Sequence, residues 1–364
     1  MNELPLVSIV IPSRNEEQFI AKCLDSILAS DYPRELLEVV VVDGMSSDGT
    51  AAIIEQYGQR YGIFHLVLNP RQITPVAFNL GIGNSQGELI MIMSAHATLG
   101  PDVIRKCVHY SRLYKADNVG GMWKIEPRDG SLFSRAAVTA LSNRFGVGGV
   151  EYRTATDGEP RWVDTAAYGC YRREVFDRIG RYNEQLVHGQ DFELNLRLKN
   201  SGSATLLAPD IVITYFARTE LRSFFQRAIR GGDWVVRAFA YSKVMTVRWR
   251  HLVPLMFVSS LMVSGALGLV FPLFFWLLAA ILALYAAANL AASCQAAIRQ
   301  HNPHLLLCLP FAFAVLHIGY GLGSVKACFK LAEMGQLRKF FVLSWKEIVT
   351  RPVDPGSVPA RPAA

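Results

Sequence analysis

Length, composition and charge already narrow the class of protein. The chain has 364 residues, of which 51% are hydrophobic, and its formal net charge is +7. Its apolar residues are concentrated after Leu252, which indicates membrane segments rather than an apolar soluble core. The six cysteines lack CxxC spacing, so we expect neither structural zinc nor disulfides. No nucleic-acid-binding motif accompanies the basic charge, so nucleic acid is not an expected partner.

The first 50 residues predict a strand, a helix and a second, parallel strand. Val7–Ile11 and Val39–Val42 are continuous apolar runs, which are typical of parallel strands covered on both faces. The helix between them stops near Tyr32-Pro33. Ligands bind such sheets at the carboxyl ends of the strands, where Pro12–Asn15 and Asp43–Asp48 lie. We therefore expect a nucleotide site at this edge of the sheet.

Strand and helix patterns then alternate to about Asp210, which indicates an α/β sheet domain. Further strands are expected near Phe64–Leu68, Glu88–Met93 and Trp162–Tyr171, and further helices near Pro75–Leu80, Pro101–Tyr114 and Asp191–Lys199. The glycines of the 146–149 segment predict a loop.

A basic amphipathic helix follows, with a predicted interruption at Gly231-Gly232. Its apolar and basic faces are formed by Leu221, Phe224, Phe225 and Ile229, and by Arg222, Arg227 and Arg230. Such a helix is typical of an interface with anionic lipids. The alternative is a helix that packs on the sheet domain.

The apolar block after this helix is long enough to cross a membrane. Leu252–Ala297 contains no Lys, Arg, Asp or Glu, and a span needs roughly 20 residues, so two helices fit, with a turn near Val270-Phe271-Pro272. Leu305–Gly323 is a third candidate. Three spans would place the basic residues after it outside, against the positive-inside tendency. Either Leu305–Gly323 is re-entrant around Pro310, or the first block is not two spans.

We therefore expect four regions along the chain: an α/β domain at 1–220, interfacial helices at 221–251, a transmembrane region of two to three or more helices at 252–324, and a basic tail at 325–364. The N-terminus has Glu3 and an apolar run broken by Pro12, so no signal peptide is expected. The α/β domain should face the cytoplasm, in a multi-pass protein of the inner (plasma) membrane.

Six stretches of the sequence, in order, resemble family 2 inverting glycosyltransferases of the GT-A fold. They are VSIVIPSRN at Val7–Asn15, VVVVDGMSSDGT at Val39–Thr50, RQITPVAFNLGI at Arg71–Ile82, FGVGGVEYR at Phe145–Arg153, YGCYRREVF at Tyr168–Phe176 and HGQDFELNLRL at His188–Leu198. With the basic segment and the apolar helices, the chain is most similar to the succinoglycan-type exopolysaccharide glucosyltransferase branch. The resemblance implies a mostly parallel sheet flanked by helices, followed by C-terminal transmembrane helices.

The resemblance implies a nucleotide site built from the strand ends. Asp43 would accept a hydrogen bond from the uracil N3–H, and its alternative role is a strand-end cap. The nucleotide would also contact Pro12, Ser13, Arg14 and Asn15. Arg71 and Asn79 lie where the family approaches the nucleotide, and each has a local structural role as its alternative.

Ser94-Ala95-His96 occupies the position of the metal-binding DxD motif of the family. Mn²⁺ or Mg²⁺ at this motif neutralises the diphosphate leaving group. The branch commonly reads Asp-Ala-His here, so Ser94 is a departure that weakens metal binding or makes Asp102 or His188 share it. His96 is the remaining candidate ligand, and a structural histidine is the alternative.

Asp191 is the candidate catalytic base, because inversion needs one carboxylate to accept the proton of the acceptor hydroxyl. Its alternative role is a helix N-cap. The family usually shows Glu-Asp here, and Gln190-Asp191 keeps the second member. Glu193 is expected to face away and to pair with Arg197.

Gln226, Arg230 and Trp234 resemble the QxxRW element of processive members, which lies by the acceptor and the diphosphate. The spacing differs, which argues against a processive polymerase. Arg230 would neutralise the leaving group where metal binding is poor. An interfacial anchor is the alternative for Trp234.

The resulting hypothesis is transfer of glucose from UDP-glucose, with inversion, to a polyprenyl-diphosphate-linked oligosaccharide in exopolysaccharide biosynthesis. A polysaccharide assembly complex is a further candidate partner. Two alternatives stay open: a polyprenyl-phosphate sugar synthase, and a degenerate homologue that binds sugar nucleotide or acts as a scaffold without turnover.

Overall fold

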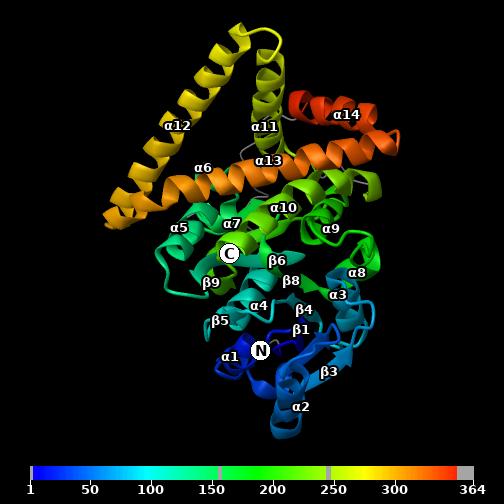
Figure 1. Ribbon diagram of the computed structural model, residues 1–364. Coiled ribbons are helices and arrows are strands. Elements are labelled where there is room, and N and C mark those ends of the chain that lie inside the picture. Colours follow the sequence, from blue (N-terminus) through cyan, green and yellow to red (C-terminus); the bar gives the residue numbers. More distant parts are fainter. Residues whose placement is uncertain (1–2, 155–157, 243–246, 351–364) are drawn as a thin grey trace. The chain divides into compact units, whose positions relative to one another are not determined.

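The computed structural model describes residues 3–154, 158–242 and 247–350 (Figure 1). These residues form two compact units, residues 3–124 with 158–216 and residues 125–154 with 217–350. Residues 125–154 therefore group with the C-terminal helices, whereas the sequence pattern had included them in an α/β domain at 1–220. The last part of the expected basic tail, 351–364, lies outside the described residues.

The described part of the first unit is built on one nine-stranded sheet in the order β3-β2-β1-β4-β8-β6-β9-β5, with β7 beside β9. Its strands are β1 (Val7–Ser13), β2 (Leu37–Asp43), β3 (Phe64–Leu68), β4 (Leu89–Ile92), β5 (Ala97–Leu99), β6 (Asn118–Pro127), β7 (Arg161–Val163), β8 (Ala167–Arg172) and β9 (Thr205–Ala217). Strands β1 to β4 are mutually parallel, and β8 runs antiparallel to β4. The amino end of β8 therefore meets the carboxyl ends of β1, β2 and β4 at one edge.

Both faces of the sheet are buried, as the continuous apolar runs predict. Ile9 and Ile11 of β1 face one core cluster, and Val10 faces another. The helices of this unit are α1 (Glu17–Leu28), α2 (Thr50–Tyr61), α3 (Thr74–Gly83), α4 (Val103–Leu113), α8 (Arg173–Ile179) and α9 (Gln190–Asn200), with a 3₁₀ turn, η1, at Arg34–Leu36. Each fully buried isoleucine contributes about 1.5–3 kcal/mol by removal from water, so β1 is fixed firmly between its two layers.

The second unit is helical. It contains α5 (Leu132–Leu141), α6 (Arg144–Val147), α7 (Glu151–Thr154), α10 (Leu221–Tyr241), α11 (Trp249–Gly268), α12 (Leu273–Arg299), α13 (Leu309–Glu333) and α14 (Leu337–Thr350), with a 3₁₀ turn, η2, at Pro303–Leu307. Among the described residues, α11, α12 and α13 are long and apolar enough to cross a membrane. The turn between α11 and α12 falls at 269–272, as predicted. These features support an association with the membrane.

Helix α10 continues through Gly231-Gly232, where the sequence predicted an interruption. The glycine at 232 instead permits close packing, because a Cβ there would lie 1.9 Å from the carbonyl oxygen of Tyr320 in α13. The reverse contact is equally close: a Cβ at Gly323 would lie 2.0 Å from the carbonyl oxygen of Ile229. The Ser324 hydroxyl also donates a 3.3 Å hydrogen bond to the Gly232 carbonyl. We call this contact between α10 and α13 the glycine seam.

The glycine seam gives a stability prediction. Gly323→Ala places a methyl group against the Ile229 carbonyl oxygen, so we expect a loss of about 1–3 kcal/mol in the free energy of unfolding. Gly265→Ala in α11 is the matched control, because nothing lies within 4 Å of a Cβ there, and alanine raises helix propensity by about 1 kcal/mol. Thermal unfolding in lipid nanodiscs measures both. Equal unfolding temperatures for the two variants would contradict the close packing.

Candidate active site

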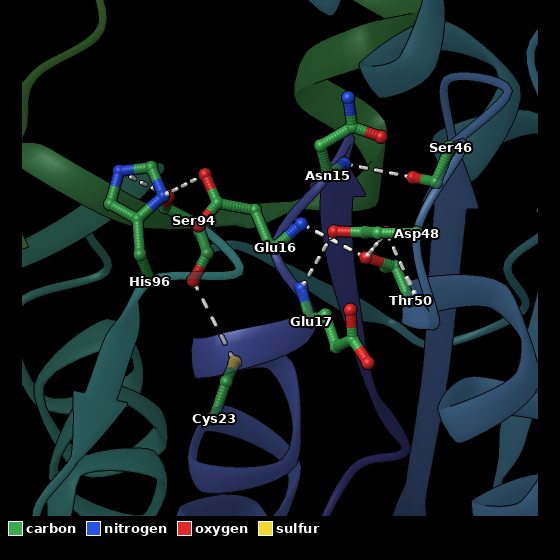
Figure 2. Close-up of polar contacts among 9 residues, drawn as sticks. All are labelled: Asn15, Glu16, Glu17, Cys23, Ser46, Asp48, Thr50, Ser94 and His96. Carbon is green, nitrogen blue, oxygen red and sulfur yellow. Dashed lines mark hydrogen bonds and ion pairs between the residues drawn. The ribbon is translucent and has the colours of Figure 1, made fainter.

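Two loops at the carboxyl ends of β1 and β2 are tied together by hydrogen bonds (Figure 2). Asn15 adopts a positive φ of 52°, its N–H donates to the Ser46 hydroxyl at 2.9 Å, and its Oδ1 accepts the Ser47 N–H at 2.9 Å. Ser46 in turn donates its N–H and its hydroxyl to the two oxygens of Asp43, at 2.8 and 2.5 Å. The loop positions implied for the nucleotide are therefore held in one fixed arrangement.

Asp43 is 1% exposed, and both of its oxygens already serve the turn that follows β2. The strand-end role named as its alternative is thus present in the structure. A carboxylate has about four lone-pair positions, so the turn leaves acceptor capacity for a ligand. Contact with a uracil ring stays a prediction.

Asp48 ties the starts of α1 and α2 to each other. Its carboxylate accepts hydrogen bonds from the Glu17 N–H at 3.3 Å and from the Thr50 N–H and hydroxyl at 3.1 and 2.5 Å. Burial alone would raise the pKa of Asp48, but the bonds from Thr50 and Glu17 lower it below its ordinary value. The Thr50 hydroxyl accepts the Glu16 N–H at 2.9 Å, which fixes the backbone of Glu16 (Figure 2).

Ser13 lies at the end of β1, directly beside Asp43 in the parallel register. It is 5% exposed, and its buried hydroxyl has no hydrogen-bond partner among the described residues. A buried polar group without a partner is costly, so this hydroxyl is a candidate contact for a ligand. Pro12 before it is half-buried and Arg14 after it is exposed, as a binding loop requires.

His96, Ser94 and Glu16 form a polar cluster at the same edge (Figure 2). The Nδ1 of His96 lies 3.0 Å from Oε1 of Glu16, and the Ser94 hydroxyl lies 3.2 Å from the ring. Glu16 is 6% exposed. Glu16 is not among the site residues predicted from the sequence, although its position directly after the β1 loop was the available signal. A buried carboxylate thus lies beside Ser94 and His96, the residues that the sequence predicts for metal binding.

The fit of this cluster to a divalent cation can be judged from its donors. Among the described residues, no group of three or more His, Cys, Asp and Glu side chains could hold a metal ion. Glu16 and His96 supply one carboxylate and one imidazole, a set that fits a cation whose other ligands are diphosphate oxygens and water. Asp102, named as a partner for this site, instead pairs with Lys106 at 2.8 Å.

Asp191 lies in the first turn of α9, and Gly189, with φ 78°, is the N-cap. The alternative role of Asp191 as the N-cap is therefore not the observed one. Desolvation raises the pKa of Asp191 to about 6, although the residue keeps accessible surface and the Tyr182 hydroxyl acts in the opposite direction. Asp191 is thus an exposed residue whose carboxylate is partly desolvated by its neighbours. Glu193 pairs with Arg197 at 2.9 Å, as expected.

Tyr182 connects Asp191 to the segment predicted to bind the nucleotide. Its N–H donates to Oδ1 of Asn79 at 2.9 Å, and Nδ2 of Asn79 donates to the Tyr182 carbonyl at 3.0 Å. Asn79 and Arg71 both also bind Glu184. The local structural roles of Asn79 and Arg71 are thus observed, and their contact with a nucleotide stays a prediction. The buried Tyr182 hydroxyl has no partner at full hydrogen-bond geometry among the described residues, although it lies close enough to Asp191 to lower its pKa.

Tyr168, at the amino end of β8, lies near both Ser94 and Asp191. It adopts a positive φ of 50°, an uncommon conformation for a bulky residue that is often retained at functional sites. Desolvation is the main cause that raises the pKa of Tyr168, and the neighbouring Tyr215 is the second. The Ser94 hydroxyl lowers this pKa, and the Asp191 charge raises it. Ser94 and Asp191 therefore lie near one side chain. Trp123 stacks on Tyr215 with ring centroids 4.6 Å apart, which adds an aromatic surface.

Gln190 lies beside Asp191, and its buried Oε1 has no partner among the described residues. The remaining predicted site residues belong to α10 of the second unit. Gln226 and Arg230 are exposed there, and the Arg237 guanidinium lies 4.7 Å from the centre of the Trp234 ring. A role for Gln226, Arg230 and Trp234 at the acceptor or the diphosphate stays a prediction.

Comparison with solved structures defines the class. The mannosyltransferase PcManGT from Pyrobaculum calidifontis, solved with GDP-Man and Mn²⁺, matches with a TM-score of 0.54 and 20% identity over 88% of each chain. This likeness shows the fold, which is the GT-A α/β fold with its mostly parallel sheet.

Comparison with sequences defines the family. The glycosyl transferase family 2 model matches residues 8–180. A dolichyl N-acetyl-alpha-D-glucosaminyl phosphate 3-beta-D-2,3-diacetamido-2,3-dideoxy-beta-D-glucuronosyltransferase of Methanococcus voltae is 30% identical over 62% of this chain and 71% of its own. The succinoglycan biosynthesis protein ExoA of Rhizobium meliloti is 26% identical over 86% of this chain and 92% of its own. The chain belongs to glycosyl transferase family 2, whose members act in glycan and glycolipid biosynthesis.

The raised pKa of Asp191 gives a pH-dependent stability prediction. The folded protein holds this proton up to about pH 6, whereas an unfolded aspartate loses it near its ordinary value of 3.8. The wild-type protein should therefore lose stability relative to Asp191→Asn as the pH rises through this window. We expect at most about 1 kcal/mol, because solvent reaches the residue. Thermal unfolding measured across the window tests this, and parallel pH curves for the two proteins would contradict it.

Proposed function

We propose that this glycosyltransferase moves a hexose, glucose from UDP-glucose, with inversion to a polyprenyl-diphosphate-linked oligosaccharide in exopolysaccharide biosynthesis. The observation that carries this proposal is a carboxylate of raised pKa, Asp191, near the same tyrosine as the Ser94 cluster. The similarity to ExoA over nearly its whole length supports the exopolysaccharide acceptor.

Asp191 is the general base of the proposed reaction. With a pKa of about 6, it is mostly ionised at neutral pH and is a stronger base than an ordinary aspartate. It takes the proton from the acceptor hydroxyl as that oxygen attacks the anomeric carbon from the side opposite the diphosphate. The bond from the anomeric carbon to the diphosphate oxygen breaks in the same step, which inverts the configuration. The Tyr182 hydroxyl beside Asp191 favours its ionised form.

Glu16 and His96 would hold Mn²⁺ or Mg²⁺ together with the donor diphosphate, in the place where the family uses an Asp-containing motif. A bound cation there would neutralise the charge that develops on the leaving diphosphate. The solved PcManGT complex contains Mn²⁺, which supports use of a divalent cation. Arg230 would add positive charge near the leaving group, and Gln226 and Trp234 would offer neutral N–H donors to the diphosphate or the acceptor.

The nucleotide would occupy the edge formed by the β1 and β2 loops. Asp43 would accept the uracil N3–H, while the unpartnered Ser13 hydroxyl and the exposed Arg14 would contact the base or the ribose. The loop that carries them is held by Asn15, so it needs little reorganisation on binding. The sheet domain would face the cytoplasm, where sugar nucleotides are made, and the helical unit would bring it to the plasma membrane, in or beside an assembly complex.

Asp191→Asn should abolish transfer and leave nucleotide binding intact. The amide cannot accept the proton of the acceptor, so we expect a loss of about 10²–10⁴-fold in kcat, with an unchanged Kd for UDP. UDP release is measured with purified protein in native membrane extract over a panel of donor sugars, which also identifies the donor. Asp177→Asn, at an exposed position of α8, is the control. Full activity in Asp191→Asn would remove the proposed base, and no turnover with any donor would favour a degenerate binding homologue.

Ser94→Asp should strengthen the dependence on Mn²⁺. It adds the carboxylate that the motif lacks beside His96 and Glu16, so the Mn²⁺ concentration for half-maximal activity should fall, and Mn²⁺ should tighten UDP binding more than in the wild type. Ser94→Asn is the matched control, because it has the same shape without the charge. An equal response to Mn²⁺ in the two variants would show that this position lies outside the cation site.

Mild-acid lability and chain length of the lipid product separate the proposed acceptor from a polyprenyl phosphate.

A further inference from the structure

The three apolar helices of the second unit differ sharply in how much of them is covered. Over its apolar stretch, 44% of α13 is buried, against 22% of α11 and 6% of α12. The hairpin of α11 and α12 is exposed up to its turn, where Leu269 is 82% and Trp276 is 77% exposed. Figure 1 shows the hairpin standing away from α13, which runs along α10. A surface this apolar requires a lipid environment.

Helix α13 cannot enter the hydrocarbon without α10. The two helices pack in parallel along the glycine seam: Gly319 lies against Ala228, and Gly323 against Ile229. The contact continues to the cluster that joins Val236 with Ala327 and Leu331. Helix α10 carries five charged side chains, at Arg222, Arg227, Arg230, Asp233 and Arg237. Charged side chains in hydrocarbon are costly, so a helix bound along α10 is held at the membrane surface.

The exposed residues of α13 gather on one face, which also carries Lys326 and, at the end of the helix, Glu333. Its exposed large apolar residues are Phe311, Ile318, Leu322 and Phe329. Their spacing of seven, four and seven residues places them on one face of a helix. The face with Leu316, Tyr320 and Gly323 packs inward. A helix that is covered on one side by a charged partner and presents an apolar stripe on the other is typical of a helix that lies in the interface plane.

The hairpin projects beyond α13 by less than a bilayer thickness. Two contacts with α13 mark where the hairpin leaves it. Val258 of α11 lies against Gly321, and the Tyr285 hydroxyl of α12 lies 3.0 Å from Nδ1 of His317. Past these points α11 has about 10 residues and α12 about 12, which at 1.5 Å per residue project about 15–18 Å. The hydrocarbon core is about 30 Å thick. From an α13 at the surface, the turn would reach about the middle of the bilayer.

The turn itself suits burial in hydrocarbon. Its residues, Leu269, Val270, Phe271 and Pro272, are all apolar. The N–H groups of the first three donate to Ala266 and Leu267 carbonyls at 3.3, 3.0 and 2.7 Å, and proline has no N–H to satisfy. Polar backbone in hydrocarbon must be bonded internally, and this turn meets that condition for its donors. A turn that emerged in water on the far side would not need to be free of polar side chains.

The open end of the hairpin carries the positive charge. Arg248 and Arg250 lie at the start of α11, and Arg299 ends α12. These positions suit the anionic headgroups of the leaflet that the hairpin enters. Both helices therefore have their basic ends on one side and their apolar turn at the other end.

We propose that α11 and α12 form a re-entrant hairpin that enters and leaves the same leaflet, and that α13 lies along the surface of that leaflet without crossing it. The occupant of the exposed apolar surface is the lipid bilayer. Lys326, Lys330 and Arg338 then remain on the side from which α11 entered, which satisfies the positive-inside tendency. The multi-pass topology predicted from the sequence is the alternative that the test must exclude.

Cysteine accessibility in membrane vesicles tests the proposal. The full chain is used with Cys294, Cys308 and Cys328 replaced by serine, because the other three cysteines are buried. Single cysteines are then added as Val270→Cys at the turn, Glu333→Cys at the end of α13 and Glu55→Cys on the exposed surface of α2 as the reference. Vesicles of both orientations are treated with a membrane-impermeant maleimide, with and without detergent.

We expect Glu333→Cys and Glu55→Cys to be labelled in the same vesicle orientation, and Val270→Cys in neither until detergent is added. A bimane attached to Val270→Cys should be quenched more by lipids brominated near the chain ends than by lipids brominated near the headgroup. Labelling of Val270→Cys only from the side opposite to Glu55→Cys would show a crossing pair of helices. Labelling of Glu333→Cys only from that opposite side would show an odd number of crossings. Either result overturns the proposal.

Discussion

The parallel pairing of β1 with β2 and β4 is the constraint on which the rest of the site depends. It brings the ends of three strands to one edge, so that Ser13 pairs with Asp43 and the chain after β4 delivers Ser94 and His96 beside Glu16. The antiparallel β8 then starts at the same edge with Tyr168. Parallel strands must be joined by crossovers, so each strand end is followed by a loop at this edge. The directions of these strands therefore bring Ser13, Asp43 and the chain after β4 together at one edge of the sheet.

Local sequence pattern was sufficient for the parallel strands β1 to β4, and insufficient for β5, β6 and β9 and for the contacts between distant loops. The continuous runs in β1 and β2 identify strands buried on both faces, because alternation is lost only when both faces are covered. Glu16 could not be assigned in the same way: its contact with His96 joins residues 80 positions apart, and it depends on β4 lying next to β1. Tyr182 was missed for a similar reason, since it lies in a loop whose position is set by Asn79 of α3. The α10 to α13 pairing was likewise invisible in the chain pattern.

The glycines at 231 and 232 show how tertiary packing can override local propensity. Two glycines inside a helix cost about 1 kcal/mol each relative to alanine, so an interruption was a reasonable prediction. The helix continues because the backbone of Tyr320 lies where a side chain would be, and the gain from close helix packing offsets the loss of propensity. This packing against α10 distinguishes α13 from α12, although length and composition alone allow both helices to cross a membrane. An apolar helix of sufficient length has a membrane role only once its partners are known, and here the partner is charged.

Asp43 and Asp191, the two acidic residues of the proposed reaction, differ in environment, and the difference matches their proposed roles. Both oxygens of Asp43 are held by Ser46, so this carboxylate is suited to a fixed recognition contact. Asp191 is desolvated, with only the Tyr182 hydroxyl favouring its charge, and its pKa rises to about 6. Such a group is about 90% ionised at pH 7 and still binds a proton more strongly than an ordinary aspartate. The protein accepts a less stable carboxylate at position 191, and this is the property that a base needs when its proton comes from a sugar hydroxyl.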